Sequence, residues 1–430
     1  MPCYTALKPT EYLPRLADEL VQQRLAQFGA VEICGPRWCG KSWTAAAFAE
    51  SIIRIDEDTT LYNDDPALAL LGEQPHVIDE WQDAPAVWNL VRHSIDDSAN
   101  RKGQYILTGS SAPPQQEQRH SGAGRIGRLR MSTMTLAETG ESSGTVSLRG
   151  LFDGVFSPQG SHMGLQELAG IICRGGWPAL QARGDAADSA PIIDEYLDAL
   201  FDITLRKAGK SPLLARRIAL ALARNIGTSA TLRTLADDAA AGEDTAPSDD
   251  TVSKYLAEFA MNYFLDELPG WDAPIRSRSR VRTKPKRYFA DPSLAAALLG
   301  TAPDRLVREG QLLGVLFESL CIHDLGVYAS MLPDASPQSL RYYADADGLE
   351  VDAVIELRDG RWAAFEVKLG ESEQEEAAAS LLRLRKKVAA NPAARNPEPE
   401  FMAILVGKGA YARQRKEDGI YVIPLDTLTA

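Results

Sequence analysis

The sequence predicts a multidomain α/β protein, and three observations lead to this prediction. The chain has 430 residues, which is more than one hydrophobic core usually serves. Short apolar runs alternate with helical patterns in its first third, as in a parallel sheet. A mostly helical middle then precedes a second α/β portion. We expect an α/β domain at 1–145, a linker or helical lid at 146–190, a helical domain at 191–300 and a second α/β domain at 301–430.

The bulk composition is that of a folded, water-soluble chain. Apolar residues make up 45% and charged residues 24%. No apolar run approaches the roughly 20 residues that cross a bilayer, and Met1–Thr10 lacks the pattern of a signal peptide, so we expect a cytoplasmic protein with no membrane partner. The five cysteines are scattered, which predicts neither a disulfide framework nor a zinc site. The net charge of −13 argues only weakly against nucleic acid, because binding depends on local charge.

The first α/β domain is expected to contain four strands. Their apolar runs are Ala30–Cys34, Ile52–Ile55, His76–Ile78 and Tyr105–Leu107. Apolar residues at helical spacing in 16–25 and an alanine-rich segment at 42–51 predict helices on either side of the first strand. Small and polar residues predict loops at 113–124 and 239–250.

A glycine-rich segment follows the first expected strand. Residues 35–42 read Gly-Pro-Arg-Trp-Cys-Gly-Lys-Ser and fit the pattern G-x-x-x-x-G-K-[ST]. The glycines let backbone N–H groups and the next helix N-terminus point at phosphate oxygens. Lys41 would contact the β- and γ-phosphates, and Ser42 would give a hydroxyl to Mg²⁺. The sequence therefore predicts an ATP site formed by Gly35, Pro36, Arg37, Trp38, Cys39, Gly40, Lys41, Ser42 and Trp43.

Two acids end the third expected strand, in the run Val77-Ile78-Asp79-Glu80. Asp79 is placed to hold Mg²⁺ through water, and Glu80 to orient and deprotonate an attacking water. The alternative is an acidic helix cap after a buried strand. The preceding P-loop favours the catalytic interpretation, because ATP hydrolysis requires such a strand end.

Hydroxyl groups end the fourth expected strand. Ser110 is the preferred candidate to sense the γ-phosphate, with Thr108 as second choice, although a plain polar turn would look the same. Arg125 is a further candidate to reach a phosphate, either in its own chain or in a neighbouring subunit. A surface role for Arg125 is an equally good interpretation.

With these motifs in order, the chain resembles a widespread bacterial and archaeal family of AAA-type ATPases whose C-terminal domain has unknown function. The resemblance implies an N-terminal P-loop AAA-like ATPase, a central winged helix and a restriction-endonuclease-like C-terminal fold. One departure is the acidic loop at 239–250, which is longer than the usual link. The matching segments are Gly35-Pro36-Arg37 with Gly40-Lys41-Ser42, Ile78–Gln82, Leu107–Ser111, Gly175–Pro178, Tyr288–Pro292, Phe317-Glu318, Glu350–Asp352 and Glu366–Lys368.

The helical middle contains a candidate DNA-binding module. Thr231–Ala236 followed by Thr251–Leu256 has the pattern of a helix–turn–helix with a lengthened turn. A basic segment comes next, with a cation at every even position from 276 to 286, so six charges would line one face of a strand. Such a wing would follow the phosphates of double-stranded DNA, unless it is a charged, protective edge strand. The candidate DNA-binding residues are Arg276, Arg278, Arg280, Arg282, Lys284, Lys286 and Arg287.

Four residues near the C-terminus form a nuclease-like pattern. Asp352 and Glu366 lie on successive expected strands and can converge on one Mg²⁺ or Mn²⁺. Lys368 shares a face with Glu366 and would position or activate water. Glu318 supplies the upstream acid. The alternative is a domain that keeps this fold without cleavage and uses acid and lysine as an ion pair.

The leading hypothesis from sequence is therefore a Mg²⁺-dependent ATPase that couples ATP to double-stranded DNA. It would work as a homo-oligomer, in which an arginine can act on a neighbouring subunit. Two alternatives remain open: a nucleotide-gated adaptor that cuts nothing, and an ATP-dependent DNA endonuclease.

Overall fold

The computed structural model describes residues 7, 9–111, 121–181, 189–240 and 245–430. Residues 113–120 of one predicted loop and 241–244 of the other lie outside these ranges. The chain forms two compact units. The first unit holds the chain up to Met134 together with Trp177–Ala179 and Phe259–Phe264, and the second holds the remainder.

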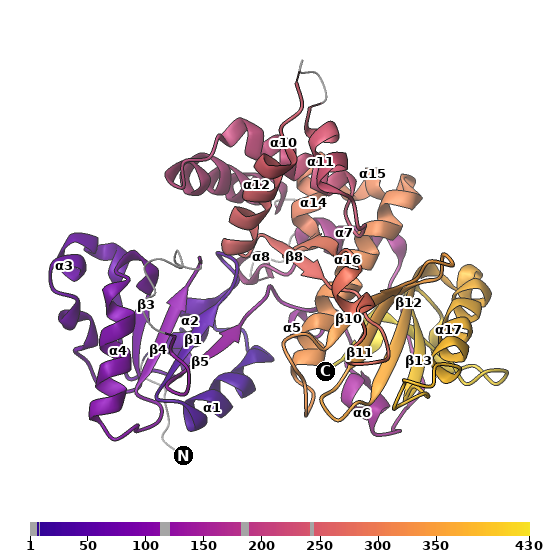
Figure 1. Cartoon of the computed structure of the whole chain (residues 1–430), viewed down its shortest axis with the longest axis horizontal. Coiled ribbons are helices and arrows are strands. Elements are labelled where there is room, and N and C mark those ends of the chain that lie inside the picture. Colours follow the sequence, from indigo (N-terminus) through magenta and orange to yellow (C-terminus); the bar gives the residue numbers. More distant parts are fainter. Residues whose placement is uncertain (1–6, 8, 112–120, 182–188, 241–244) are drawn as a thin grey trace. The chain divides into compact units, whose positions relative to one another are not determined.

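The first unit is built on a five-stranded parallel sheet with the order β2-β3-β4-β1-β5 (Figure 1). The four strands predicted from sequence are confirmed, and β5 is an addition that the sequence analysis did not predict. The strands are β1 (Ala30–Cys34), β2 (Ser51–Arg54), β3 (His76–Asp79), β4 (Tyr105–Gly109) and β5 (Ile126–Arg130).

Helices cover both faces of this sheet. Alternate side chains of the strands point to opposite faces, and two apolar clusters result. One contains Val31 of β1 with side chains of α1 (Ala17–Gln27) and α2 (Lys41–Ala47). The other contains Ala30 of β1 with side chains of α4 (Ala86–Asp97). A sheet covered on both faces buries its central strands, and β1 is buried at every position. The short helix α3 (Thr59–Asp64) and three 3₁₀ segments complete the unit.

The middle of the chain is helical, as predicted. Its helices begin where the sequence offers caps: Ser211 caps α10, Thr231 caps α11 and Asp291 caps α14. An antiparallel hairpin of β8 and β9 follows α12. The elements are α7 (Leu165–Arg174), α8 (Pro178–Gln181), α9 (Ser189–Asp198) with a π-helical continuation (Ala199–Leu205), α10 (Pro212–Arg224), α11 (Leu232–Ala239), α12 (Asp249–Met261), β8 (Leu265–Leu268), α13 (Ser279–Arg282), β9 (Lys286–Phe289), α14 (Pro292–Leu298) and α15 (Pro303–Arg308).

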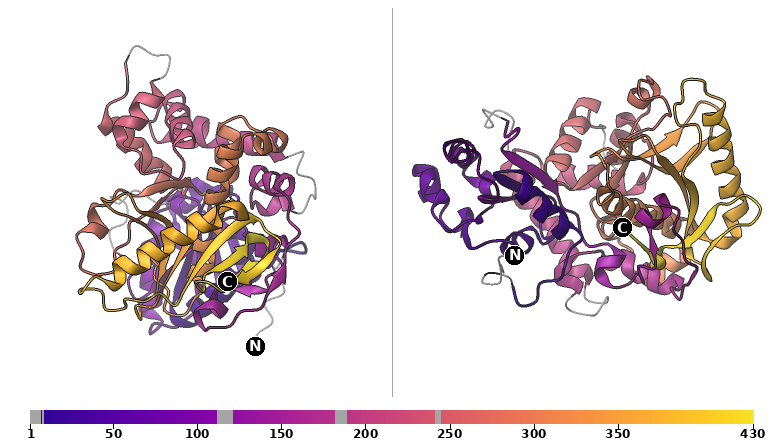
Figure 2. Two further views of the ribbon diagram at one scale, coloured as in Figure 1. Left: turned by 90° about the vertical axis from the view of Figure 1, so that its right-hand side faces the viewer. Right: turned by 90° about the horizontal axis from the view of Figure 1, so that it is seen from below.

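The C-terminal part of the second unit contains a seven-stranded mixed sheet with the order β10-β11-β12-β13-β15-β14-β7. The chain passes from β12 to the parallel strand β13 through a long helix, α17, which lies along one face of the sheet (Figure 2). The elements are α16 (Gly310–Ser330), β10 (Leu340–Ala344), β11 (Glu350–Glu356), β12 (Trp362–Gly370), α17 (Gln374–Ala389), β13 (Phe401–Lys408), β14 (Tyr411–Gln414) and β15 (Tyr421–Pro424).

The segment after the first unit contributes strands to this C-terminal part, which the sequence did not predict. β7 (Gln159–Gly160) pairs with β14 at one end of the large sheet. β6 (Val146–Ser147) pairs with β16 (Leu428–Thr429) in a separate two-stranded sheet. Two short helices, α5 (Leu136–Thr139) and α6 (Leu148–Phe152), flank β6.

By length and composition alone, helix α16 is long and apolar enough to span a membrane. Most of it is buried inside the second unit, however, as in the core helix of a folded domain. It also carries acids on its buried surface, among them Asp324, which accepts a hydrogen bond from the Leu136 N–H at 3.0 Å.

Candidate nucleotide site and acidic cluster

The glycine-rich loop after β1 has the backbone that its pattern predicts. Gly35 has a φ of 152°, and a Cβ on it would lie 2.1 Å from the Met131 carbonyl oxygen. Gly40 has a φ of 99° and stands immediately before α2. Lys41 is buried, and its Nζ donates to the Pro36 carbonyl oxygen at 2.7 Å. Glycine is thus required at both turns, and the lysine lies within the loop.

The loop and the acidic strand end meet directly. Ser42 Oγ donates to Asp79 Oδ1 at 2.8 Å, and Thr108 Oγ1 donates to the same oxygen. Burial raises the pKa of Asp79, and these two hydroxyl donors partly oppose the rise. The residues expected to bind Mg²⁺ therefore lie together, and parallel strands explain why, since the ends of β3 and β4 share one edge of the sheet.

Glu80 is oriented by two side chains. It follows β3 with a left-handed φ of 54°, a conformation that costs free energy in a residue with a side chain. Ser110 Oγ donates to Glu80 Oε2 at 2.9 Å, and Gln82 Nε2 donates to the same oxygen. Ser110 thus contacts the expected general base, whereas Thr108 contacts the expected metal ligand.

Sequence reasoning missed the residues that brace this site. Arg15, before α1, donates to the Cys39 carbonyl oxygen at 2.7 Å and to the Ser132 carbonyl oxygen at 2.8 Å. It therefore joins the glycine-rich loop to the segment after β5. No local pattern marks Arg15. Gln82, in contrast, lies two residues from Glu80 within a segment that supports the family resemblance.

Arg125 lies away from the loop, which corrects one expectation. It precedes Ile126, which pairs with Ala30 at the start of β1, whereas the loop follows Cys34 at the other end. A five-residue strand spans roughly 16 Å. Arg125 forms an ion pair with Asp96 at 2.8 Å. A phosphate contact within its own chain is thus contradicted. Contact with a neighbouring subunit stays a prediction.

The residues present fit a nucleotide with Mg²⁺. Gly35 and Gly40 both take positive φ angles, as glycines do in loops whose backbone N–H groups bind phosphate. Oxygen atoms of Ser42 and Asp79 already lie in contact, and oxygen is the ligand that Mg²⁺ prefers. Trp38 and Trp43 of the predicted set are largely exposed, at 40% and 49%, so they remain accessible for contact with a base or a partner.

In the second unit the structure brings together the four nuclease-like candidates. Asp352 Oδ2 accepts a hydrogen bond from the Val367 N–H at 2.8 Å, which ties β11 to β12. Lys368 Nζ lies 3.5 Å from Glu366 Oε2. Glu318, on α16, is close enough to Asp352 for its charge to raise the pKa of Glu318, in addition to the larger effect of burial. We call Glu318, Glu350, Asp352 and Glu366 the acidic cluster.

A lysine that the sequence assigned to DNA lies inside the acidic cluster. Lys286 Nζ lies 2.6 Å from Glu350 Oε1, 3.1 Å from Glu318 Oε1 and 3.7 Å from Asp352 Oδ1. Its side chain is 3% exposed. Tyr288, two residues later on β9, donates to Glu318 Oε1 at 2.7 Å. The acids therefore surround an ammonium group.

Burial and a neighbouring carboxylate favour the protonated forms of two acids of the cluster. Burial raises the pKa of Glu366, and nearby Asp352 raises it further. Burial and Asp352 likewise raise the pKa of Glu318. Within the part of the chain that the structure describes, no group of three or more His, Cys, Asp or Glu residues is arranged to hold a metal ion. The predicted Mg²⁺ or Mn²⁺ site at Glu318, Asp352, Glu366 and Lys368 is therefore not preformed.

Comparison with protein families identifies the first α/β domain. Residues 27–140 match the family model described as an AAA domain. An AAA domain forms the N-terminal part of this chain. Residues 165–305 and 313–428 match two domains of unknown function, DUF8612 and DUF4143. The resemblance to AAA-type ATPases with a C-terminal domain of unknown function is confirmed, and the AAA domain supports ATP binding and hydrolysis.

Several solved structures are similar to the chain at low identity. A Walker-type ATPase of Pyrococcus abyssi is 12% identical, with 69% of this chain and 99% of that chain covered and a TM-score of 0.43. The RuvB Holliday junction branch migration motor of Thermotoga maritima is 18% identical, with coverages of 61% and 93% and a TM-score of 0.27. AMPPCP-bound DnaA from Aquifex aeolicus is 15% identical, with coverages of 59% and 92% and a TM-score of 0.23. No curated protein matches the chain.

Outside the AAA domain, the basic segment differs from its prediction. It is not one strand with its cations on one face, because Ser279–Arg282 is helical and strand β9 begins at Lys286. The alternating charges therefore point in different directions. Arg287 pairs with Glu267 of β8 at 3.1 Å and donates to the Ala230 carbonyl oxygen at 2.8 Å.

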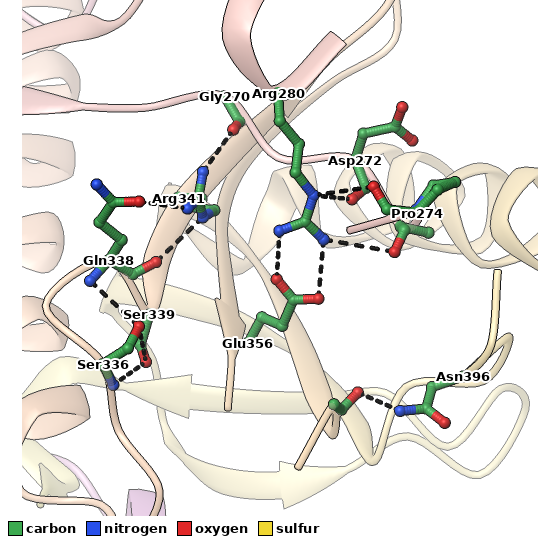
Figure 3. A network of polar contacts seen from close by, with 12 residues as sticks. Gly270, Asp272, Pro274, Arg280, Ser336, Gln338, Ser339, Arg341, Glu356 and Asn396 are labelled. Carbon is green, nitrogen blue, oxygen red and sulfur yellow. Dashed lines mark hydrogen bonds and ion pairs between the residues drawn. The ribbon is translucent and has the colours of Figure 1, made fainter. Parts of the chain in front are cut away.

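Arg280 fastens the basic segment to the C-terminal sheet. Its guanidinium forms two hydrogen bonds with the Glu356 carboxylate, at 2.6 and 2.8 Å, and also contacts the carbonyl oxygens of Asp272 and Pro274 (Figure 3). The adjacent backbone pairs with edge strand β10, where the Trp271 N–H donates to the Tyr342 carbonyl oxygen at 2.6 Å. The backbone just before the basic segment therefore covers a sheet edge.

The remaining cations of the basic segment are exposed. They are Arg276, Arg278, Arg282 and Lys284. The predicted DNA surface is thereby reduced from seven residues to these four.

Proposed function

We propose that the protein is a Mg²⁺-dependent ATPase that couples ATP binding and hydrolysis to contact with double-stranded DNA. The observation that carries the ATPase part is the 2.8 Å hydrogen bond between Ser42 and Asp79. It joins the phosphate-binding loop to the acidic strand end, two motifs that are 37 residues apart in the sequence. ATP hydrolysis in P-loop proteins needs both in one place.

The roles of the residues follow from their positions. Backbone N–H groups of the glycine-rich loop and Lys41 bind the phosphates. Ser42 and Asp79 would hold Mg²⁺, which neutralises charge on the phosphates. Glu80 accepts the proton of the attacking water, and Ser110 keeps the Glu80 carboxylate oriented.

The DNA part of the proposal is supported by the helical middle. Helices α11 and α12 are followed by the hairpin of β8 and β9, which is the order of a winged helix. The exposed residues Arg276, Arg278, Arg282 and Lys284 lie between those two strands. Four cations on one connection can neutralise several phosphates, so binding should weaken steeply with salt.

A second candidate function is a nucleotide-gated switch in the cytoplasm that recruits partners and cuts no DNA. The observation that favours it is Lys286, whose ammonium lies among the carboxylates that a nuclease would use for metal. A third candidate, an ATP-dependent endonuclease, would need the acidic cluster to bind Mg²⁺ or Mn²⁺.

The oligomeric state is part of the proposal. Arg125 lies at the sheet edge opposite the glycine-rich loop, so an arginine for the γ-phosphate would come from a neighbouring copy. We therefore infer a homo-oligomer in the ATP-bound state, which sedimentation with and without a non-hydrolysable ATP analogue would detect. Sedimentation as a monomer under both conditions would refute this part.

Paired assays test the proposal. ATP turnover of the wild type is measured with and without duplex DNA, beside Lys41→Ala and the exposed-lysine control Lys102→Ala. We expect turnover that DNA increases and that Lys41→Ala removes. Turnover that DNA does not change would favour the switch, and absence of ATP binding would refute the ATPase.

Cleavage is assayed in Mg²⁺ and in Mn²⁺ with wild type and Asp352→Ala, and cutting that the variant loses would establish the endonuclease.

A further inference from the structure

Lys286 is the cation that approaches most of the carboxylates in the acidic cluster. Four carboxylates and two ammonium groups meet there, those of Lys286 and Lys368. Lys286 approaches three of the carboxylates and is almost fully buried, whereas Lys368 pairs with Glu366 and is 23% exposed. A buried ammonium is stable only when it is paired. The acids and Lys286 therefore depend on each other.

The hairpin of β8 and β9 determines where Lys286 points. Lys286 pairs in register with Leu268, the last residue of β8. Residues two apart on a strand share a face, so Lys286 and Tyr288 both point to the acidic cluster while Arg287 points away to Glu267. The bidentate contact of Arg280 with Glu356 holds the same connection a few residues earlier. Two independent anchors thus fix the ammonium in place.

We infer that Lys286 is the resident cation of the acidic cluster and that it excludes divalent metal ions while β9 stays paired. A metal ion bound by Glu318 and Asp352 would need the space and the oxygen atoms that the ammonium uses. A restriction-endonuclease-like fold implies such a metal, and the residues of this chain do not fit it in the described conformation. The hairpin therefore keeps the C-terminal domain closed to metal. This inference does not depend on ATP hydrolysis.

Binding of Mn²⁺ by the nucleotide-free, full-length chain tests the inference, with bound Mn²⁺ measured by electron paramagnetic resonance. Four proteins are compared: the wild type, Lys286→Met, Lys286→Met combined with Asp352→Asn, and the matched control Lys284→Met, which changes an exposed lysine two residues away. We expect Lys286→Met to bind about one more Mn²⁺ per chain than the wild type. The double variant should lose that ion, and Lys284→Met should equal the wild type.

Two results would overturn the inference. One is Mn²⁺ binding by the wild type that is lost in the Asp352→Asn variant. The other is a folded Lys286→Met variant that gains no Mn²⁺. If Lys286→Met fails to fold, the wild type and Asp352→Asn still test the inference. These two proteins should bind equal amounts of Mn²⁺. A Mn²⁺-dependent rise in the melting temperature of Lys286→Met, absent from the wild type, would support the inference independently.

Discussion

Carboxylates gather both in the nucleotide site and in the acidic cluster, and their surroundings differ. In the AAA domain, Asp79 and Glu80 accept hydrogen bonds from neutral groups, namely the hydroxyls of Ser42 and Ser110 and the amide of Gln82. In the acidic cluster of the second unit, the carboxylates surround the ammonium of Lys286.

This difference shows that carboxylates alone do not define a metal site. A hydroxyl can turn and become a metal ligand itself, so Ser42 does not compete with Mg²⁺. An ammonium has no free electron pair, so it cannot be a ligand, and it occupies oxygen atoms that a metal ion would use. Patterns of acids in a sequence therefore predict where metal chemistry can occur, and the neighbouring cations determine whether it does.

The largest effect is expected for Glu80→Gln. This variant tests whether the carboxylate next to Asp79 acts as the base in ATP hydrolysis. The variant keeps the size and hydrogen bonds of the side chain and removes only the base. We expect ATP turnover to fall about 10²- to 10⁴-fold while ATP affinity changes little, as measured by steady-state hydrolysis and equilibrium binding. The control Glu73→Gln alters an exposed acid near β3 and should keep wild-type turnover. Equal turnover of Glu80→Gln and wild type would exclude Glu80 as the base.

The next largest effect is a loss of stability when the ion pair between Arg280 and Glu356 is removed. Arg280 and Glu356 are 11% and 16% exposed, and removing one partner of a buried ion pair costs about 3–5 kcal/mol. We expect Arg280→Ala to lower the free energy of unfolding by that amount, as measured by urea denaturation. Replacing both partners, in Arg280→Met with Glu356→Leu, should recover much of it.

Arg278→Ala is the control for this second prediction. It removes an exposed arginine of the same segment, and surface changes usually alter stability by less than about 0.5 kcal/mol. If Arg278→Ala and Arg280→Ala destabilised the protein equally, the contact with Glu356 would not be the anchor.

The nucleotide site was predictable because its motifs are local. The glycine-rich loop and Asp79 each follow an apolar strand, and parallel strands bring their ends to one edge of a sheet. Strand β5 was missed because arginines interrupt it. One of these, Arg128, forms an ion pair with Glu32 at 2.6 Å, a partner on β1 that no local pattern reveals.

The positions of the basic side chains could not be predicted, because their partners are distant in sequence. Arg280 binds an acid 76 residues away, and Lys286 binds one 32 residues away. Alternating charge is equally compatible with a solvated strand and with a segment whose cations are paired individually. The apolar residues at Tyr288 and Phe289 were the one signal that this strand is buried.

A smaller effect is expected from Ser110→Ala. This variant tests whether Ser110, after β4, orients Glu80. The hydroxyl donates to Glu80 at 2.9 Å, and a hydrogen bond to a charged group contributes roughly 1.5–3 kcal/mol. We expect kcat to fall about tenfold or somewhat more, with KM for ATP nearly unchanged, because Ser110 orients the base. Ser111→Ala is the neighbouring control. A loss confined to KM would instead assign Ser110 to ATP binding.

The smallest effect is a dependence of stability on pH at the AAA site, through Asp79. Burial raises the pKa of Asp79 above its ordinary value of 3.8. The folded state then binds the proton more tightly than the unfolded state, so the associated stability is present at low pH and is lost as pH rises through the folded pKa. Asn cannot ionise, yet its Oδ1 can accept from Ser42 and Thr108 as Asp79 does. Nucleotide-free Asp79→Asn should therefore melt at a higher temperature than the wild type at about pH 8, with the gap narrowing towards about pH 5. A gap that widens as pH falls would mean that the pKa of Asp79 is lowered in the folded state, and the rise that burial is expected to cause would be refuted.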